Sequence, residues 1–376
     1  MRDWVDPVNN FLFADVDGNI GYLTRGRVPI RSHGNGWLPV PGWTGEHEWE
    51  GCIPFEEMPR SHNPEANYIV TANQRVAGSD YPYYISLDSA PEFRARRIAI
   101  RLGELDRATV EDMEGVHAER TSIPAQRYVK RLLEIETLRI SSQRGALQLL
   151  EGWDCSMDPD SMGASLYSAI RLHLDRRILR HVLGPLAEEA LTETSRGGPS
   201  HAARLRAHFV QLMEQDDTSL LPPGATWDEL LAKAYIDAVH ELAKENGPEF
   251  GEAWQWGRVH HTAPKHPLSE VFPEASQLLD PPSVASGGDG DTPQAASYSP
   301  AQPYAISSTS VLRYIYDLSD WSNSRWIAPL GSSGHPGSAH YADQSATWSQ
   351  VGYIPMLYDW SQIAKGAESC QVLRTG

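Results

Sequence analysis

The chain has 376 residues, of which 40% are hydrophobic and 22% charged, a composition typical of a globular protein with an ample core. Its 49 acidic residues outnumber the 32 Lys and Arg residues and give a formal net charge of −17. That balance argues against nucleic-acid binding and against binding to anionic membranes, because both need concentrated positive charge. No stretch approaches the roughly 18 consecutive apolar residues of a transmembrane helix.

The first motif, FADVDGNIGY at residues 13–22, predicts a β-hairpin. Apolar runs flank Asp17-Gly18, a pair that tolerates the positive φ of a tight turn. Two acids in this motif resemble the opening of a helix–loop–helix calcium loop. The twelfth position counted from Asp15 is Gly26, which offers no ligand, so we expect a turn without a metal.

Three regions of the chain differ in composition and in hydrophobic periodicity. Residues 1–88 carry many turn signals between short apolar runs and predict a strand-rich part. Residues 89–247 show helical periodicity, and residues 248–376 return to Gly, Ser, Pro and Trp. We expect these regions to be parts of a single domain, the last being a closing α+β segment.

The sequence predicts two helices together with the residues at which they end. Apolar residues recur every four positions over 161–183, and Gly184-Pro185 follows them. Thr226 and Glu229 form a capping box that opens a second helix, which ends near Gly247. We expect these helices to serve packing rather than chemistry.

Residues 281–303, PPSVASGGDGDTPQAASYSPAQP, have the composition of a linker. Composition alone predicts a flexible joint at this place.

The segment YIVTANQ at residues 68–74 is the first candidate for chemistry. It reads as an apolar strand that ends in two amides. The amide of Asn73 can point its N–H groups into a cleft and stabilise an oxyanion. Alternatively, Asn73 only bonds the local backbone at the end of a strand.

A second candidate is the helical segment PEFRARRIAIRLGEL. Arg94, Arg97 and Arg101 are spaced three and four residues apart and share one face. Such a face can hold a carboxylate or anchor buried acids, or it is simply solvated and ion-paired.

Two histidine-rich segments predict no site of their own. The spacing in the first does not fit a zinc motif. The second suggests a Ser–His–Asp triad, but it lacks a Gly-x-Ser-x-Gly elbow, so we expect an ordered polar loop. The first group comprises His240, His260, His261 and His266; the second comprises Ser333, His340 and Asp343.

The twelve tryptophans can fill a large core or form a platform that stacks on sugar rings. Cys52, Cys155 and Cys370 are too few and too scattered for a disulfide framework or a zinc site. The first residues have no apolar signal core, so no secretion signal is expected in the chain as written.

Taken in order, several segments resemble the second half of the catalytic chain of penicillin acylases, a family of N-terminal-nucleophile amidohydrolases that includes acyl-homoserine-lactone acylases. The resemblance extends over nearly the whole chain and rests on the order of the segments. They are FADVDGNIGY, GRVPIR, LPVPGWTGEHEWEGCIPFEEMP, NPEANYIVTANQRV, DYPYYI, FRARRI, HPLSEVFP, GGDGDT, SVLRYIYDL and GHPGSAHYADQSATW.

This resemblance implies an α+β fold, namely part of a four-layer αββα hydrolase core with a helical insertion. It implies hydrolysis of linear amides, an oxyanion-hole role for Asn73, and a place for Arg97 near the nucleophile, with Arg96 one register away. It also implies an ordered loop at GGDGDT in place of a joint. A structural Ca²⁺ is implied, with Asp88 as a candidate ligand.

The family's N-terminal Ser nucleophile is missing from this chain. The segment SNSRW at residues 322–326 resembles its surroundings but differs in spacing and position. We therefore expect the chain alone to be inactive and to need the missing N-terminal portion or the small acyl-binding chain as partner. The alternatives are a non-catalytic subunit or remnant, and a carbohydrate-binding protein that uses exposed Trp.

Overall fold

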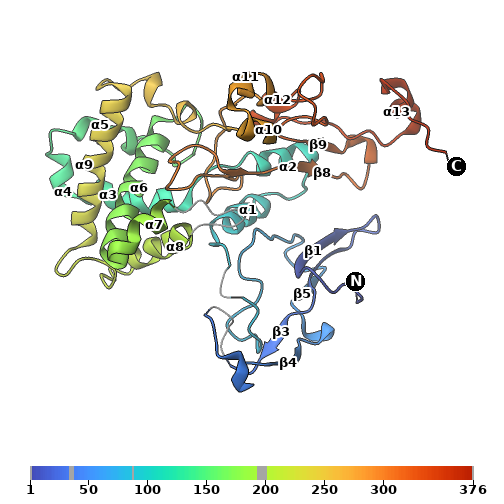
Figure 1. Cartoon of the computed structure of the whole chain (residues 1–376), viewed down its shortest axis with the longest axis horizontal. Coiled ribbons are helices and arrows are strands. Elements are labelled where there is room, and N and C mark those ends of the chain that lie inside the picture. Colours follow the sequence, from blue (N-terminus) through green and yellow to red (C-terminus); the bar gives the residue numbers. More distant parts are fainter. Residues whose placement is uncertain (1, 34–37, 87–88, 193–200, 375–376) are drawn as a thin grey trace. The chain divides into compact units, whose positions relative to one another are not determined.

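The computed structural model describes residues 2–33, 38–86, 89–192 and 201–374 (Figure 1). The chain divides into two compact units, Met1–Arg107 and Ala108–Gly376. Helices and small antiparallel sheets make up both units, which confirms the α+β class. No helix in the described ranges is both long and apolar enough to cross a membrane.

The first unit holds two small antiparallel sheets and one helix. Strands β1, β2 and β5 form the first sheet in the order β1-β2-β5, and β3 pairs with β4 in the second. The helix α1 follows them in the chain. The bounds are β1 (Asn9–Ala14), β2 (Ile20–Arg25), β3 (Pro29–Arg31), β4 (Trp49–Cys52), β5 (Arg60–His62) and α1 (Phe93–Gly103).

The β1–β2 hairpin confirms the prediction from FADVDGNIGY, and Asp15 closes the turn between the two strands. Asp15 Oδ1 accepts hydrogen bonds from the backbone N of Asp17 at 3.0 Å and of Asn19 at 2.9 Å. Gly18 has a φ of 87°, which suits glycine. Hydrogen bonds from the Asn19 side chain lower the pKa of Asp15. The carboxylate that resembled a calcium ligand therefore serves the turn.

The strand expected over residues 68–71 does not form a ladder. These residues are in neither a helix nor a strand and belong to no sheet of the described chain. Thr71 Oγ1 accepts a hydrogen bond of 3.3 Å from the Asn10 side chain instead. An apolar run becomes a strand only when a neighbour supplies hydrogen-bonding groups, and the described segments supply none here.

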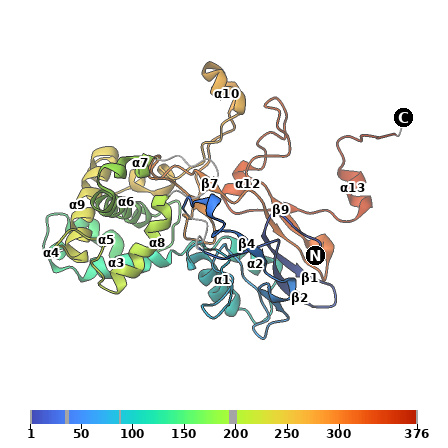
Figure 2. The ribbon, with the colours of Figure 1, turned by 60° about the horizontal axis from the view of Figure 1, so that its bottom comes forward.

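The second unit is mainly helical. Its long helices are α6 and α9, which pack side by side (Figures 1 and 2). The helices of this unit are α2 (Val110–His117), α3 (Ile123–Glu134), α4 (Glu136–Arg139), α5 (Arg144–Glu151), α6 (Met162–Leu183), α7 (Ala187–Thr192), α8 (His201–Glu214), α9 (Trp227–Asn246), α10 (Pro267–Val271), α11 (Ser276–Leu279), α12 (Ser345–Ser349) and α13 (Trp360–Gly366).

The structure confirms both of the helices whose ends the sequence predicted. The periodic residues of α6 form the centre of the core, where Leu166, Leu174 and Ile178 are fully buried. Thr226 caps α9 with the predicted box, because its side chain accepts from the Glu229 backbone N and the Glu229 side chain bonds back.

Short strands complete this unit. Strands β8, β9 and β10 form an antiparallel sheet in the order β10-β9-β8, and β6 pairs with β7. Their bounds are β6 (Ala296–Ser297), β7 (Ser308–Thr309), β8 (Arg313–Ile315), β9 (Arg325–Ile327) and β10 (Ile354–Pro355).

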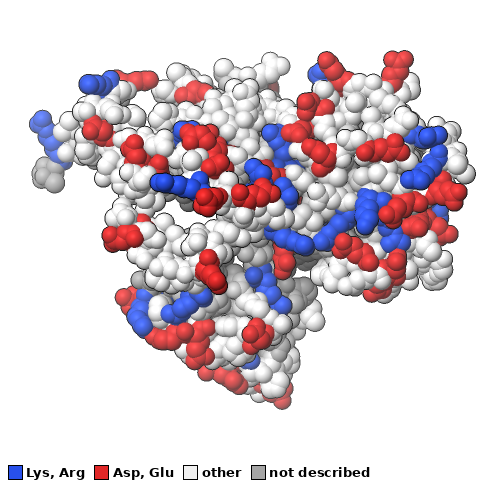
Figure 3. All heavy atoms as spheres, turned by 180° about the vertical axis from the view of Figure 1, so that it is seen from behind, with Lys and Arg blue, Asp and Glu red and all other residues white. Residues whose placement is uncertain are grey.

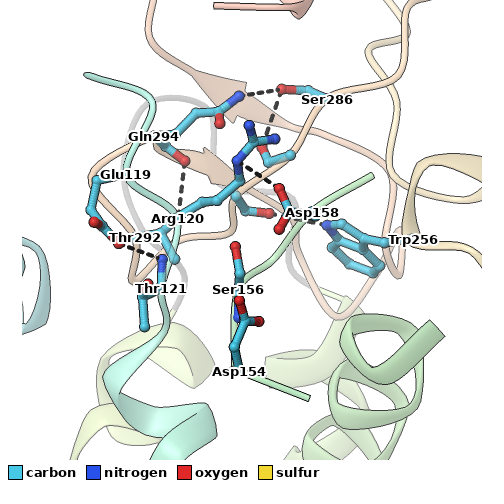
Figure 4. Close-up of polar contacts among 12 residues, drawn as sticks. Glu119, Arg120, Thr121, Asp154, Ser156, Asp158, Trp256, Ser286, Thr292 and Gln294 are labelled. Atoms are coloured by element: carbon cyan, nitrogen blue, oxygen red, sulfur yellow. Dashed lines mark hydrogen bonds and ion pairs between the residues drawn. The ribbon is translucent and has the colours of Figure 1, made fainter. Parts of the chain in front are cut away.

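The segment 281–303 is not a flexible joint, which corrects the interpretation from composition. Thr292 and Gln294 are buried, and Gln294 Nε2 donates to Ser286 Oγ at 3.3 Å (Figure 4). The backbone N of Gln294 donates to the Glu119 carbonyl at 2.8 Å. Gly288 has a φ of 84°, and a Cβ there would lie 1.9 Å from the Gln294 carbonyl oxygen. The glycines allow tight packing, as the resemblance implied for this loop.

This loop also brings acids into a buried ion-pair network that the helical pattern did not predict. Arg171 of α6 lies 2.5 Å from Asp291, and Arg206 of α8 lies 2.6 Å from Asp175 of α6. Asp289 is buried beside them, and its carboxylate accepts from the Asp291 backbone N at 2.7 Å. Three carboxylates thus face two guanidinium groups. The network is internal, whereas acidic side chains are scattered over the surface (Figure 3).

Burial, followed by the charge of Asp291, raises the pKa of Asp289 to about 6. A carboxyl with a raised pKa in the folded state binds its proton more tightly there. Its contribution to stability is therefore present at low pH and is lost as the pH rises from about 4 to about 6.

We predict that the free energy of unfolding of the wild type falls relative to that of Asp289→Asn over this window, with a slope of at most about 1.4 kcal/mol per pH unit. Urea unfolding of both proteins at a series of pH values measures this difference. A difference that stays constant or grows in favour of the wild type would contradict the assignment.

Candidate active site

The first unit places Asn73 against the arginine face of α1. Arg94 Nη2 donates to the Asn73 side-chain Oδ1 at 2.9 Å and to the Ala72 carbonyl oxygen at 2.8 Å. A guanidinium group has donors only, so the oxygen of the Asn73 amide must face Arg94. The amide nitrogen therefore points away from Arg94.

The backbone around Asn73 holds this side chain in place. Asn73 has a φ of 66°, in the left-handed region that asparagine tolerates better than most residues. Its carbonyl oxygen accepts from the Ala90 backbone N at 2.8 Å. Gln74 braces the turn, because its side chain accepts from the Ala72 backbone N at 2.6 Å and donates to the Val70 carbonyl oxygen at 3.1 Å.

The geometry gives the Asn73 amide a defined donor direction. Asn73 is exposed, while Ala72 before it is buried, so the amide stands at the surface of a packed segment. An exposed N–H donor held by a charged neighbour is suited to an anionic oxygen, because it need not reorganise to bind. The side-chain oxygen of Asn73 thus accepts from Arg94, and the oxyanion role of its amide nitrogen stays a prediction.

The other arginines of α1 differ in their surroundings. Arg97 is half-buried one turn after Arg94, whereas Arg96 is exposed. Arg101 forms an ion pair of 2.8 Å with Glu104. Arg94 is thus the arginine that contacts Asn73, and the role of Arg97 stays a prediction.

Asp88, the candidate calcium ligand, lies outside the described residues. Among the described residues, no three His, Cys, Asp or Glu side chains come together in a group that could hold a metal ion.

His340 belongs to an ion-pair cluster rather than to a triad. Its Nδ1 lies 2.8 Å from Asp343 Oδ2, but its Nε2 lies 3.1 Å from Glu368 Oε2, where a triad would place a serine hydroxyl. Hydrogen bonds to these carboxylates raise the pKa of His340 to about 9. A protonated imidazole cannot serve as a general base at neutral pH, which supports an ordered polar loop.

The other histidines also have local roles. His260 is buried and stacks on Trp256 with ring centroids 4.2 Å apart, and burial lowers its pKa to about 4. His266 caps α10 by accepting from the Leu268 backbone N at 3.1 Å.

The tryptophans divide between core and surface. Trp227, Trp254, Trp256 and Trp348 are almost fully buried. The most exposed ones, Trp43, Trp49 and Trp360, lie on three separate elements. The burial supports the core interpretation, and no observation among the described residues favours a sugar platform.

Comparison with known proteins decides the family. The profile of the family described as "Penicillin amidase" matches residues 1–365. The chain belongs to the penicillin amidase family. It is 39% identical to the penicillin acylase 2 proenzyme of a Pseudomonas species over 376 residues, covering 99% of this chain and 47% of that protein. It is 28% identical to the acyl-homoserine lactone acylase QuiP of Pseudomonas fluorescens, covering 92% of this chain and 43% of that protein.

The fold agrees with this assignment. A penicillin G acylase structure from Alcaligenes faecalis, described as thermostable, aligns with a TM-score of 0.61 at 18% identity, covering 98% of this chain and 68% of that chain. The chain therefore has the α+β fold of the part of this penicillin G acylase that it matches. It spans about half the length of the curated relatives that it matches.

Sequence reasoning identified Asn73 and the arginine face of α1 but did not pair them. The contact between Arg94 and Asn73 joins residues 21 positions apart. Helical spacing places Arg94 and Arg97 on one face and gives no reason to choose between them for this contact.

Proposed function

We propose that this penicillin amidase family chain is part of an amidohydrolase that cleaves linear amides to a carboxylic acid and an amine. The observation that carries the proposal is the hydrogen bond from Arg94 to Asn73 Oδ1, which turns the amide nitrogen outward. The names of the relatives suggest the substrate class, an acyl side chain on a β-lactam nucleus or on a homoserine lactone.

In this proposal Asn73 supplies an oxyanion donor. Attack on the amide carbonyl converts its oxygen to an anion in a tetrahedral intermediate. The Asn73 Nδ2–H is a neutral donor, so it stabilises the developing charge without adding a proton to it. Arg94 acts as a positioning residue, because it holds Asn73 Oδ1 and thereby sets the direction of Nδ2.

The nucleophile in this proposal is an N-terminal Ser on a segment outside this chain, activated by its own α-amine. Arg97 lines the site near that amine, and a structural Ca²⁺ involving Asp88 remains a prediction that follows from the family alone. The chain without the nucleophile segment is then inactive.

Arg94→Met tests the positioning role in the enzyme assembled with its nucleophile segment. We predict that kcat for amide hydrolysis falls about tenfold or more, while KM changes little. The reason is that a misoriented Asn73 side chain weakens a hydrogen bond made to the transition state and not to the bound substrate. Arg94→Lys restores part of kcat, since lysine also has donors only.

Steady-state kinetics on a chromogenic N-acyl anilide measures both parameters. The matched control is Arg96→Met, two residues along the same helix but exposed. Equal effects of the two Met variants, or a rise in KM alone, would contradict the positioning role.

The substrate class is tested on the same assembled enzyme. Release of free amine from a phenylacetylated β-lactam or from an N-acyl homoserine lactone is the expected result. Turnover of esters with no turnover of any linear amide would overturn the proposed reaction.

A further inference from the structure

The interface between α6 and α9 contains a run of ion pairs that is interrupted. His173 Nε2 lies 2.8 Å from Glu241 Oε2, and one turn later Arg177 pairs with Asp237. Residue numbers rise along α6 as they fall along α9, so the helices are antiparallel. Beyond these pairs, Arg180 of α6 and Lys233 of α9 line one pocket, so two cations stand where the run of complementary pairs ends.

A pocket of about 470 Å³ lies at this interruption. Arg176, Arg177, Arg180 and Lys233 contribute four permanent positive charges to its lining, and Asp237 contributes the lining's one carboxylate. His173 lines it as well. In a chain with a net charge of −17, this concentration of positive charge is local and unusual.

The nearby acids offset only part of this positive charge. The pKa of Glu241 is lowered by its hydrogen bond with His173 and, to a smaller extent, by the charge of Arg176. Asp237 is held by Arg177, and Arg180 forms a 2.9 Å pair with Glu188 in which both side chains are more than half exposed. Such exposed pairs contribute little. Among the described residues, the structure records no hydrogen bond or ion pair for the side chains of Arg176 and Lys233.

Helix electrostatics explains only part of this arrangement. Arg180 lies in the last turn of α6, where the helix dipole favours a cation. Lys233 lies in the second turn of α9, beyond the reach of that effect. An anion in the pocket would be attracted by both side chains, which line it from the two helices.

We propose that this pocket binds a small phosphate monoester through Arg176, Arg180 and Lys233. A phosphate carries about two negative charges near pH 7 and offers three acceptor oxygens, which matches several converging donors better than one carboxylate does. Pro222, Ala225 and Leu230 line the same pocket and provide apolar surface for the organic part. A volume of this size suits a small molecule.

Binding of phenyl phosphate to the protein, measured by calorimetry at low ionic strength, tests the proposal. Phenylacetate and inorganic phosphate serve as comparison ligands. We expect phenyl phosphate to bind most tightly, phenylacetate about tenfold more weakly, and added salt to weaken the binding. Equal binding of phenylacetate would show a general carboxylate site and overturn the phosphate assignment.

Lys233→Gln and Arg176→Gln are each expected to weaken phenyl phosphate binding about tenfold, the loss of one charge-assisted contact. Lys244→Gln is the matched control, because Lys244 lies on α9 but does not line the pocket. A loss as large in Lys244→Gln as in Lys233→Gln would overturn the proposed site.

Lys233→Glu gives a second measurement that does not depend on affinity. It extends the run of complementary pairs, so we expect a higher melting temperature without ligand and no further rise on adding phenyl phosphate. For the wild type, we expect phenyl phosphate to raise the melting temperature above that of the unliganded protein. Wild-type melting that phenyl phosphate leaves unchanged would contradict the proposal.

Discussion

Replacing Asn73 with Asp in the assembled enzyme is expected to lower kcat for amide hydrolysis by about 10²–10³-fold, the usual cost of one oxyanion donor. Aspartate has nearly the same shape and tolerates the left-handed backbone at this position, where φ is 66°. It also keeps an oxygen facing Arg94. The change therefore removes the Nδ2 donor and places a negative charge near the developing oxyanion while preserving the fold.

Asn67→Asp is the matched control, because Asn67 also has a left-handed backbone, with a φ of 59°. It makes the same chemical change a few residues upstream, and it should leave kcat within about twofold of the wild type. Asn73→Gly supplies a second test, since glycine suits the backbone and removes the side chain without adding charge. Normal turnover in Asn73→Gly would exclude an oxyanion role for this side chain.

Replacing Arg171 with Met is expected to destabilise the second unit by about 3–5 kcal/mol. Arg171 is 3% exposed, and its guanidinium faces Asp291, so its removal leaves three buried carboxylates with Arg206 as their one remaining counter-charge in the network. The double variant Arg171→Met, Asp291→Asn should recover part of the loss, because it removes charge from both sides of the pair.

Urea unfolding measures this effect, with Arg258→Met as control. Arg258 pairs with Glu252 at 3.2 Å, but their side chains are 60% and 81% exposed. Such a pair contributes about 1 kcal/mol or less. Similar losses for the buried and the exposed arginine would show that the network does not stabilise the unit.

Local signals explain which elements were predictable. The β1–β2 hairpin, the capping box of α9 and the apolar face of α6 each depend on residues a few positions apart. Their sequence patterns describe the forces that form them, and the structure has all three. Residues 68–71 do not form the predicted strand, because a strand needs a hydrogen-bonding partner that the local sequence pattern does not specify.

The features that local sequence patterns did not predict depend on contacts between distant segments. Arg171 and Asp291 are 120 residues apart, so the local sequence around either residue does not predict their ion pair. The Gly-rich loop around Asp289 has a linker's composition, yet its glycines allow close approach and its acids meet buried arginines. The resemblance to a known family indicated an ordered loop where composition indicated a joint.

The same limit applies to the candidate site. The residue pattern made Asn73 a candidate but left an ordinary structural explanation open, and the family resemblance then favoured the oxyanion role. The structure adds the reason for its orientation, which is a donor-only partner at Oδ1. The role of Arg97 and that of Asp88 follow from resemblance alone and remain predictions.

The most direct test of the proposed amidohydrolase is hydrolysis of a linear amide by this chain, alone and joined to the portion of the Pseudomonas penicillin acylase 2 proenzyme that it does not match. We predict no turnover by the chain alone and measurable turnover by the joined protein, which is lost when the proposed Ser nucleophile of the added portion is replaced by Ala. Equal turnover by the chain alone, after removal of contaminating acylase, would contradict the claim that its nucleophile lies elsewhere.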